Sequence, residues 1–119
     1  MSVAAALSIV VGAAPAAAQD AAAGAVVFKK CSVCHATSAG KASSMGPHLG
    51  GIVGRKAGSA PNYVYSKAMA SAGFRWDAAK LDAYLTKPQV MVKGTKMGFG
   101  GLSNPKDRQD VIAYLATLK

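Results

Sequence analysis

The sequence predicts an all-α fold: a single domain of three to five helices joined by long loops. Near the C-terminus, apolar residues recur at helical spacing, at Val111, Tyr114, Leu115 and Leu118. No segment shows the alternating pattern of a half-buried strand. The length of 119 residues suits one domain. We therefore expect helices to supply the core and the loops between them to carry any special chemistry.

Residues 1–18 differ from the rest of the chain. Fourteen of them are Ala, Val, Ile, Leu or Met, and none is charged. Residues 3–11 resemble the apolar centre of a secretory signal, and residues 16–18, all alanine, supply a small-residue cleavage pattern. The run is shorter than the roughly 20 apolar residues of a membrane span, and Pro15 interrupts it. We expect a signal peptide at 1–18 and the folded domain at 19–119.

No Lys or Arg precedes this apolar run, although a secretory signal usually has a positive charge there. Two alternatives therefore stay open. The natural start lies further upstream, or the segment is an uncleaved N-terminal anchor that tethers the domain to a membrane.

The first and last helices are expected at residues 20–30 and after Asn104. Asn104 is a good N-cap, and Pro105 suits the first helical position. Gly24 and Phe28 lie four residues apart and so share one helix face. A glycine inside a helix costs about 1 kcal/mol relative to alanine, which indicates that another backbone comes close there. We therefore expect these two helices to cross, with glycine against an aromatic side chain.

The segment from Cys31 to His35 is a C-x-x-C-H motif, the pattern of covalent c-type haem attachment. Two thiols about one helical turn apart can each form a thioether with one vinyl group of the same porphyrin. His35, on the same short helix, would then lie under the iron as an axial ligand. A thioredoxin-like dithiol and a zinc site are the alternatives. Zinc needs about four ligands, and the chain offers only Cys31, Cys34, His35 and His48, of which His35 is badly placed to share one tetrahedron with the cysteines.

The loop at residues 36–54 contains Pro47 and His48. The carbonyl oxygen of Pro47 is free to accept a hydrogen bond from the second ring nitrogen of His35, which would orient the imidazole. His48 is the other candidate metal ligand in this region. Because it follows His35 by 13 residues in the loop beneath the same haem face, we expect it to face solvent.

Two short helices are expected in the middle of the chain. Ser66 can cap one that runs to residue 71, and Asp77 can cap another that Pro88 stops. The stretch 88–101 is then a long loop, and long loops in small domains are usually functional. Within it, Met97 has glycine-rich surroundings that would let the backbone approach a ring. We expect Met97 to bind the iron opposite His35.

The chain is strongly basic, with a formal net charge of +9. All 14 Lys and Arg residues lie from Lys29 onward, against five Asp and no Glu. Such a balance suits nucleic acid, an anionic membrane or an acidic protein surface. The lysines are scattered rather than clustered in one run, which argues against nucleic acid. We expect an acidic protein partner.

Taken together, the motifs resemble a class I cytochrome c, the small type found in mitochondria and as bacterial cytochrome c2. The resemblance spans residues 24 to 118. The matching positions are Phe28, Cys31, Cys34, His35, Gly46, Pro47, Gly54, Arg55, Tyr65, Trp76, Tyr84, Gly94, Thr95, Lys96, Met97 and Tyr114. The resemblance implies an all-α domain wrapped around one covalently bound haem c, with His35 and Met97 as axial ligands.

The resemblance also implies roles for other side chains around the haem. Arg55, Tyr65 and Trp76 would contact a buried propionate, because a buried carboxylate is costly unless it is paired and hydrogen-bonded. Tyr84 and Thr95 would line the methionine side.

Two departures from the family pattern affect the loop that carries Met97. Lys93 stands where a proline commonly precedes Gly-Thr-Lys-Met, so this loop is expected to be looser than usual. Gln89 and Val90 replace residues that are commonly basic, so the docking surface has fewer positive charges. Lys30, Lys93 and Lys96 then become the main candidates for partner docking near the haem edge.

The expected function is electron transfer between redox proteins, by a carrier that is not an enzyme. The resemblance implies a monomer with an oxidase, reductase or reaction centre as partner, no nucleic acid partner and no membrane span in the mature chain. We expect the protein in the periplasm. The alternative is a haem peroxidase or gas-binding protein with an open iron, which the Lys93 departure alone favours.

Overall fold

The computed structural model describes residues 19–40 and 45–119. The predicted signal segment at 1–18 lies outside them. In chain order the elements are α1 (Ala21–Val27), the 3-10 helix η1 (Phe28–Lys30), α2 (Lys67–Ala70), α3 (Ala78–Thr86), α4 (Pro88–Met91) and α5 (Pro105–Ala116). Within these ranges the only strand-like pairing is one isolated bridge between Lys56 and Arg75. The all-α prediction is confirmed.

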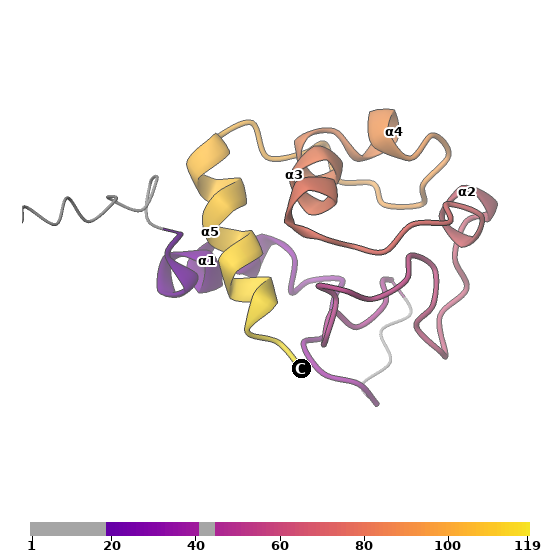
Figure 1. Cartoon of the computed structure of the whole chain (residues 1–119), viewed down its shortest axis with the longest axis horizontal. Coiled ribbons are helices and arrows are strands. Elements are labelled where there is room, and N and C mark those ends of the chain that lie inside the picture. Colours follow the sequence, from indigo (N-terminus) through magenta and orange to yellow (C-terminus); the bar gives the residue numbers. More distant parts are fainter. Residues whose placement is uncertain (1–18, 41–44) are drawn as a thin grey trace, which may run out of the picture.

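Helices α1 and α5 cross at one end of the molecule (Figure 1). A Cβ atom at Gly24 would lie 1.9 Å from the backbone oxygen of Asp110, so only glycine allows this approach. Next to it, the rings of Phe28 and Tyr114 pack with centroids 5.0 Å apart. The predicted crossing, with glycine against an aromatic residue, is confirmed.

Polar caps fix the start of both terminal helices. The Asp20 side chain accepts hydrogen bonds from the N–H groups of Ala22 and Ala23, and that of Asn104 accepts one from Lys106. The backbone N–H of Asp20 donates to the Asp110 carboxylate at 3.0 Å, which ties the beginning of α1 to the middle of α5.

The middle helices are also capped as expected. The side chain of Ser66 accepts from Met69 N–H at the start of α2, and that of Asp77 accepts from Lys80 N–H at the start of α3. The prediction for the following segment was incomplete. Pro88 ends α3 but also begins α4, because Lys87 takes an extended conformation and proline is favoured at the first position of a helix. The predicted loop at 88–101 therefore starts with one helical turn.

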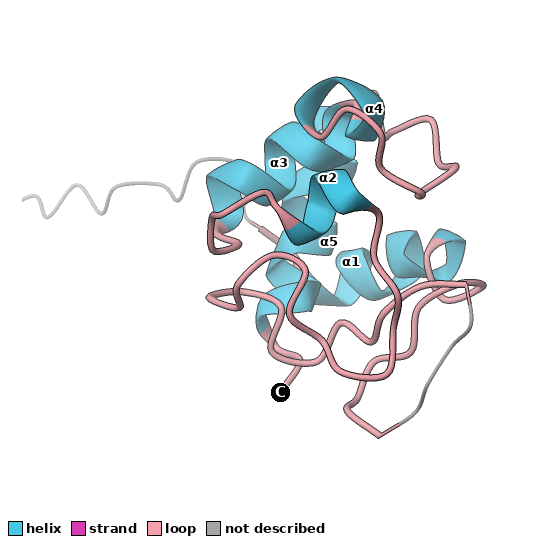
Figure 2. Ribbon diagram, turned by 90° about the vertical axis from the view of Figure 1, so that its right-hand side faces the viewer, coloured by secondary structure: helices cyan, strands magenta, loops and turns pink. Residues whose placement is uncertain are grey.

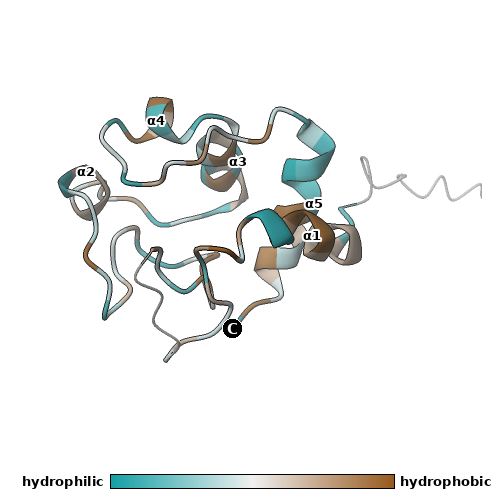
Figure 3. Ribbon diagram, turned by 180° about the vertical axis from the view of Figure 1, so that it is seen from behind, coloured by the Kyte–Doolittle hydropathy of each residue, from teal (hydrophilic) through white to brown (hydrophobic). Residues whose placement is uncertain are grey.

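Helices α3 and α4 lie over one side of the domain, and the loops at 31–40 and 45–65 lie at the other (Figure 1 and Figure 2). Colouring by hydropathy shows α1 as strongly apolar, whereas the first half of α5 is hydrophilic (Figure 3). The second half of α5 contributes Val111, Ile112 and Leu115 to the core. No helix in the described ranges is long and apolar enough to cross a membrane.

Candidate haem site

A cavity of about 550 Å³ lies between the loops and the helices. All ten residues that the sequence predicted for cofactor binding line it: Cys31, Cys34, His35, Pro47, Arg55, Tyr65, Trp76, Tyr84, Thr95 and Met97. The rest of its wall is mainly apolar and comes from α3, α5 and the intervening loops, with Ile52, Leu81 and Val111 among the buried members. The structure thus brings residues from across the sequence to the wall of one cavity.

The two cysteines lie in hydrogen-bonded turns directly after η1. They were predicted to lie on a short helix with His35, and this prediction was wrong. The N–H groups of Cys34 and His35 both donate to the carbonyl oxygen of Cys31, at 3.0 and 2.9 Å, but the regular helix has already ended. Cys, Ser and Val are weak helix formers, so tertiary placement decides the local conformation here. Both thiols still face the cavity, and burial raises the pKa of the Cys31 thiol.

The ring of His35 is oriented by the backbone of Pro47. Its Nδ1 lies 2.7 Å from the Pro47 carbonyl oxygen, as the sequence predicted. A carbonyl oxygen can only accept, so Nδ1 carries the proton and Nε2 is left with a free lone pair. Burial lowers the pKa of His35, although the bond to Pro47 opposes this shift. The imidazole is therefore held neutral, which is the form that binds metals.

Arg55 brings a cation to the cavity wall. Its two terminal nitrogens donate to the carbonyl oxygens of Gly50, at 3.1 Å, and His48, at 2.9 Å. The backbone of Arg55 pairs with that of Trp76, whose N–H donates to the Arg55 oxygen at 2.9 Å. The remaining nitrogen, Nε, is buried and has no hydrogen-bond partner in the described part of the chain. Burial lowers the pKa of this guanidinium.

Tyr65 lies on the same wall and has a hydrogen to donate. Its hydroxyl oxygen accepts a hydrogen bond from the N–H of Ala60 at 3.0 Å. The hydroxyl hydrogen is not needed for that bond, because the Ala60 N–H is the donor.

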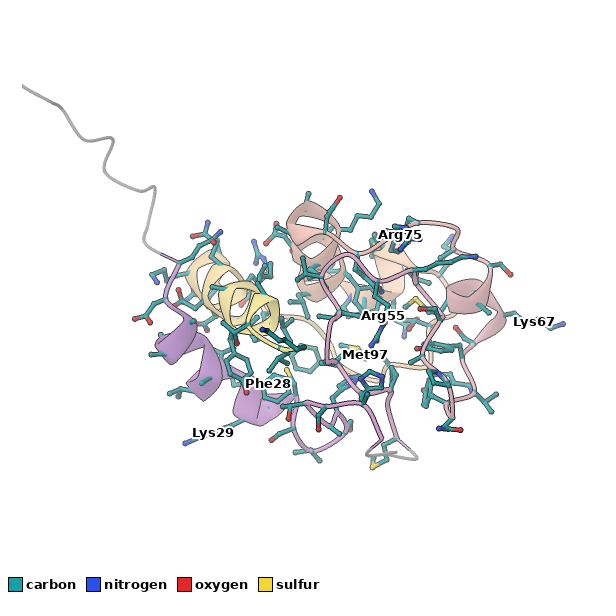
Figure 4. All side chains as sticks on the ribbon, turned by 60° about the horizontal axis from the view of Figure 1, so that its bottom comes forward. Phe28, Lys29, Arg55, Lys67, Arg75 and Met97 are labelled. Carbon is teal, nitrogen blue, oxygen red and sulfur yellow. The ribbon has the colours of Figure 1, made fainter. Side chains whose placement is uncertain are left out.

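Arg55 and Met97 both lie in the middle of the molecule, whereas Lys29 and Lys67 project outward (Figure 4).

The methionine side of the cavity is built from α3 and the segment that follows α4. The hydroxyl groups of Tyr84 and Thr95 lie 2.7 Å apart, and both side chains are buried. Burial raises the pKa of Tyr84, so its hydroxyl keeps its proton near neutral pH. The same Thr95 oxygen accepts a hydrogen bond from the N–H of Met97 at 3.4 Å. Met97 is half-buried and borders the cavity.

The sequence did not predict that Gln89 contacts this segment. The side-chain amide of Gln89 on α4 donates to the carbonyl oxygens of Thr95 and Met97. The sequence drew attention to Gln89 only as a position without positive charge. The one feature of the sequence that could have indicated this contact was a polar side chain directly after Pro88.

The second histidine is also placed differently from the prediction. His48 is half-buried rather than solvent-facing, because its Nδ1 is enclosed and lacks a partner among the described residues. Burial and the nearby Arg55 lower its pKa. It does not line the cavity, and the described residues hold no group of three or more His, Cys, Asp or Glu that could bind a metal ion.

The three candidate docking lysines are all exposed. Lys30 and Lys96 border the cavity, but Lys93 does not. Lys96 also makes internal contacts, since its ammonium donates to the Val64 carbonyl oxygen at 2.7 Å and lies 5.9 Å from the centre of the Tyr63 ring. Lys96 therefore links the two loops that flank the cavity.

Comparison with known proteins gives consistent matches. The family model described as cytochrome c matches residues 21–119. Cytochrome c2 of Rhodomicrobium vannielii is 50% identical over 101 residues, covering 85% of this chain and 81% of that protein. Cytochrome c of Arabidopsis thaliana is 45% identical over 97 residues, covering 81% of this chain and 87% of that protein. The solved structure of cytochrome cH from Methylobacterium extorquens superposes with a TM-score of 0.77 at 45% identity, covering 82% of this chain and 98% of that one.

Proposed function

Because the chain belongs to the cytochrome c family, we propose that it shuttles single electrons with His35 and Met97 as the axial ligands of its haem. It is an electron-transfer protein and not an enzyme, and its cofactor is one haem c attached through Cys31 and Cys34. The observation that carries the axial assignment is the shared cavity, which has the oriented imidazole of His35 and the side chain of Met97 on its wall.

The cavity suits a large apolar group that carries acidic substituents. Its volume of about 550 Å³ lies within the roughly 300–1,000 Å³ of typical cofactor sites. The Nε of Arg55 is a buried donor that has no partner among residues 19–40 and 45–119, and such a donor costs free energy unless an acceptor satisfies it. A carboxylate is the acceptor that best suits a guanidinium. These points support a haem propionate bound by Arg55 together with Tyr65 and Trp76.

The protein's own residues keep the site rigid. The Pro47 carbonyl holds the His35 ring, and the Tyr84–Thr95 pair holds the segment that carries Met97. Buried side chains such as Leu81 and Val111 give the cavity an apolar wall. With imidazole and thioether ligands, a bound haem supplies a one-electron Fe(III)/Fe(II) couple. If the residues around the iron are held rigidly, little rearrangement is needed when the charge of the iron changes. This favours electron transfer over the binding of a reactant.

A redox titration of the purified holoprotein, with a ferric absorption spectrum, tests this proposal. We expect one reversible one-electron step, a low-spin spectrum with a weak long-wavelength sulfur-to-iron band, and no uptake of carbon monoxide. High-spin ferric haem that binds carbon monoxide readily would contradict the proposed ligation and favour a peroxidase or gas-binding protein.

Its partners are other redox proteins. We propose that the protein acts as a monomer and that Lys30, Lys93 and Lys96 steer it to acidic surfaces on those partners. Supporting this, all three side chains are exposed and two of them border the cavity. Raising the ionic strength should slow the reaction with an acidic redox protein, because salt screens the attraction.

Matched substitutions test the docking surface. At low salt, Lys30→Gln and Lys96→Gln should each slow the reaction more than Lys29→Gln, since Lys29 is exposed but does not border the cavity. An association rate that stays constant from low to high salt would show that these lysines do not steer the protein to its partner.

We further propose that residues 1–18 direct export and that residues 19–119 function in the periplasm. The apolar, uncharged composition of residues 1–18 supports this. Mass spectrometry of the exported protein tests it. Cleavage near residue 18 is expected, and an intact N-terminus would indicate a membrane-tethered carrier instead.

A further inference from the structure

The segment that carries Met97 is held by a side chain outside it. The Nε2 atom of Gln89 lies 3.1 Å from the Thr95 carbonyl oxygen and 3.2 Å from the Met97 carbonyl oxygen. Both acceptors are carbonyls, so only the NH2 end of the amide can make these bonds, and its two hydrogens serve one acceptor each. We infer that Gln89 is a positioning residue that keeps Met97 in place for ligation. This inference rests on the proposed role of Met97 as an axial ligand.

The two bonds complete a set of restraints around Met97. Its N–H donates to the Thr95 hydroxyl, which is itself bonded to Tyr84 on α3. Its carbonyl oxygen accepts from Gln89 on α4. Both backbone polar groups of Met97 are thus held, one through α3 and the other through α4. Without Gln89, the bond to the Thr95 hydroxyl is the one hydrogen bond that the described residues still make to the backbone of Met97.

The two hydrogen bonds from Gln89 to the Thr95 and Met97 carbonyl oxygens form a clamp on the segment that carries Met97. The sequence around Met97 gives a reason why this clamp is needed. Four of the eight residues from 94 to 101 are glycine, and glycine has more backbone freedom to lose on ordering than any other residue. Lys93 precedes this stretch and does not restrict φ as a proline would. A turn joins Val92 to Thr95, whose N–H donates to the Val92 oxygen at 3.1 Å. The turn fixes the beginning of the segment, and Gln89 fixes it at the ligand itself.

The clamp also accounts for a neutral residue at this position. Gln89 is exposed and close to the proposed docking surface, where a cation would add to electrostatic steering. An amide adds none, but it supplies two hydrogens at a fixed angle for the two neighbouring carbonyl groups. The structure thus assigns Gln89 a role within the molecule rather than toward a partner.

The test compares Gln89→Met, Gln89→Glu and the control Gln109→Met in the ferric holoprotein. Methionine keeps the length of the side chain and removes both donors. Glutamate replaces the donors with acceptors, which repel the two carbonyl oxygens. Gln109 lies on α5 and does not border the cavity, so the control makes the same chemical change elsewhere.

Two readouts report on Met97 rather than on folding alone. One is the temperature at which the sulfur-to-iron band is lost, compared with that of global unfolding. The other is the affinity for added imidazole, which must displace the sulfur. For Gln89→Met we expect imidazole to bind about tenfold more tightly, equivalent to about 1.4 kcal/mol and on the scale of two net hydrogen bonds. Gln89→Glu should bind it more tightly still, and Gln109→Met should match wild type within about twofold.

A second substitution provides the rescue. Adding Lys93→Pro to Gln89→Met restricts the backbone of the segment by other means. The double variant should therefore bind imidazole several-fold more weakly than Gln89→Met alone. In wild type, nuclear Overhauser contacts are expected between the Gln89 side-chain amide protons and residues 95–97. This last measurement needs no variant, so the inference can be overturned even if Gln89→Met fails to fold.

The outcomes separate the two claims. A wild-type ferric protein without the sulfur-to-iron band would overturn the proposed ligation and the clamp together. If wild type has the band and Gln89→Met binds imidazole no more tightly than Gln109→Met, the clamp alone is wrong. Absence of the amide contacts in wild type would also overturn it.

Discussion

The Nδ1 atom of His35 lies 2.7 Å from the carbonyl oxygen of Pro47, twelve residues further along the chain. This bond fixes the ring plane and the tautomer, so the free nitrogen, Nε2, is left to bind metal. Gly46 makes the approach possible, since a Cβ atom there would lie 2.8 Å from Cε1 of His35 and 2.9 Å from its Nδ1. The backbone of residues 46–47 therefore acts as a support for the imidazole.

Gly46→Ala should displace the His35 ring and weaken the domain. The added methyl group would also lie 2.9 Å from the Cys34 carbonyl oxygen, and such overpacking typically costs about 1–3 kcal/mol. Denaturant unfolding of the holoprotein and its reduction potential would measure the effect. Gly100→Ala is the control, because the described residues other than its chain neighbours place no heavy atom within 4 Å of its added Cβ. Equal stability and potential in the two variants would contradict this account of the support.

Asp110 should make stability depend on pH on the acid side. The hydrogen bond from Lys106, and then that from the Asp20 N–H, hold the pKa of this carboxyl below its usual range. The native state therefore binds fewer protons than the unfolded chain, so the stabilisation is full above the ordinary aspartate pKa of about 4 and is lost as the pH falls through the lower native value.

Asp110→Asn should therefore lower the free energy of unfolding at pH 7 and flatten its dependence on pH below about 5. Asp107→Asn, a matched change in the first turn of the same helix, should affect this dependence less. Urea unfolding at a series of pH values checks both. A slope in Asp110→Asn as steep as that of wild type would show that another group is responsible.

Lys93→Pro should stabilise the protein. Lys93 is the second residue of the turn from Val92 to Thr95, and Gly94, the third, has φ of +89° as in a type II turn. Proline is favoured at the second position, and it reduces the freedom of the unfolded chain by about 0.4–1 kcal/mol. Denaturant unfolding should show this gain over both wild type and Lys93→Ala. A loss of stability in the proline variant would mean that the turn differs from this description.

The sequence predicted those parts of the fold and site that depend on local signals. Asn104 with Pro105, and Asp77, marked helix starts because capping is a property of a few neighbouring residues. Residue type and spacing likewise indicated Cys31, Cys34 and His35, whereas glycine-rich surroundings and the family resemblance indicated Met97. All four of these residues line the cavity.

Some features that depend on tertiary contacts were not predicted, although the crossing of α1 with α5 and the bond between His35 and Pro47 were. Helix α4 has only four residues, too few for a periodic pattern, and Pro88 was interpreted as a stop signal alone. The motif cysteines were expected on a helix because their spacing suits one, but the chain is already in turns there. The bonds from Gln89 to Thr95 and Met97 follow from how α4 lies against the next segment, which no spacing rule specifies.

The spin state of the ferric iron in Met97→Ala shows whether the thioether of Met97 binds the iron. Alanine has no sulfur, so if Met97 is the second axial ligand, the long-wavelength band should disappear and the iron should become high-spin or take up a ligand from solution. The wild-type protein should remain low-spin under the same conditions. A Met97→Ala spectrum that keeps both the band and the wild-type spin state would contradict the account.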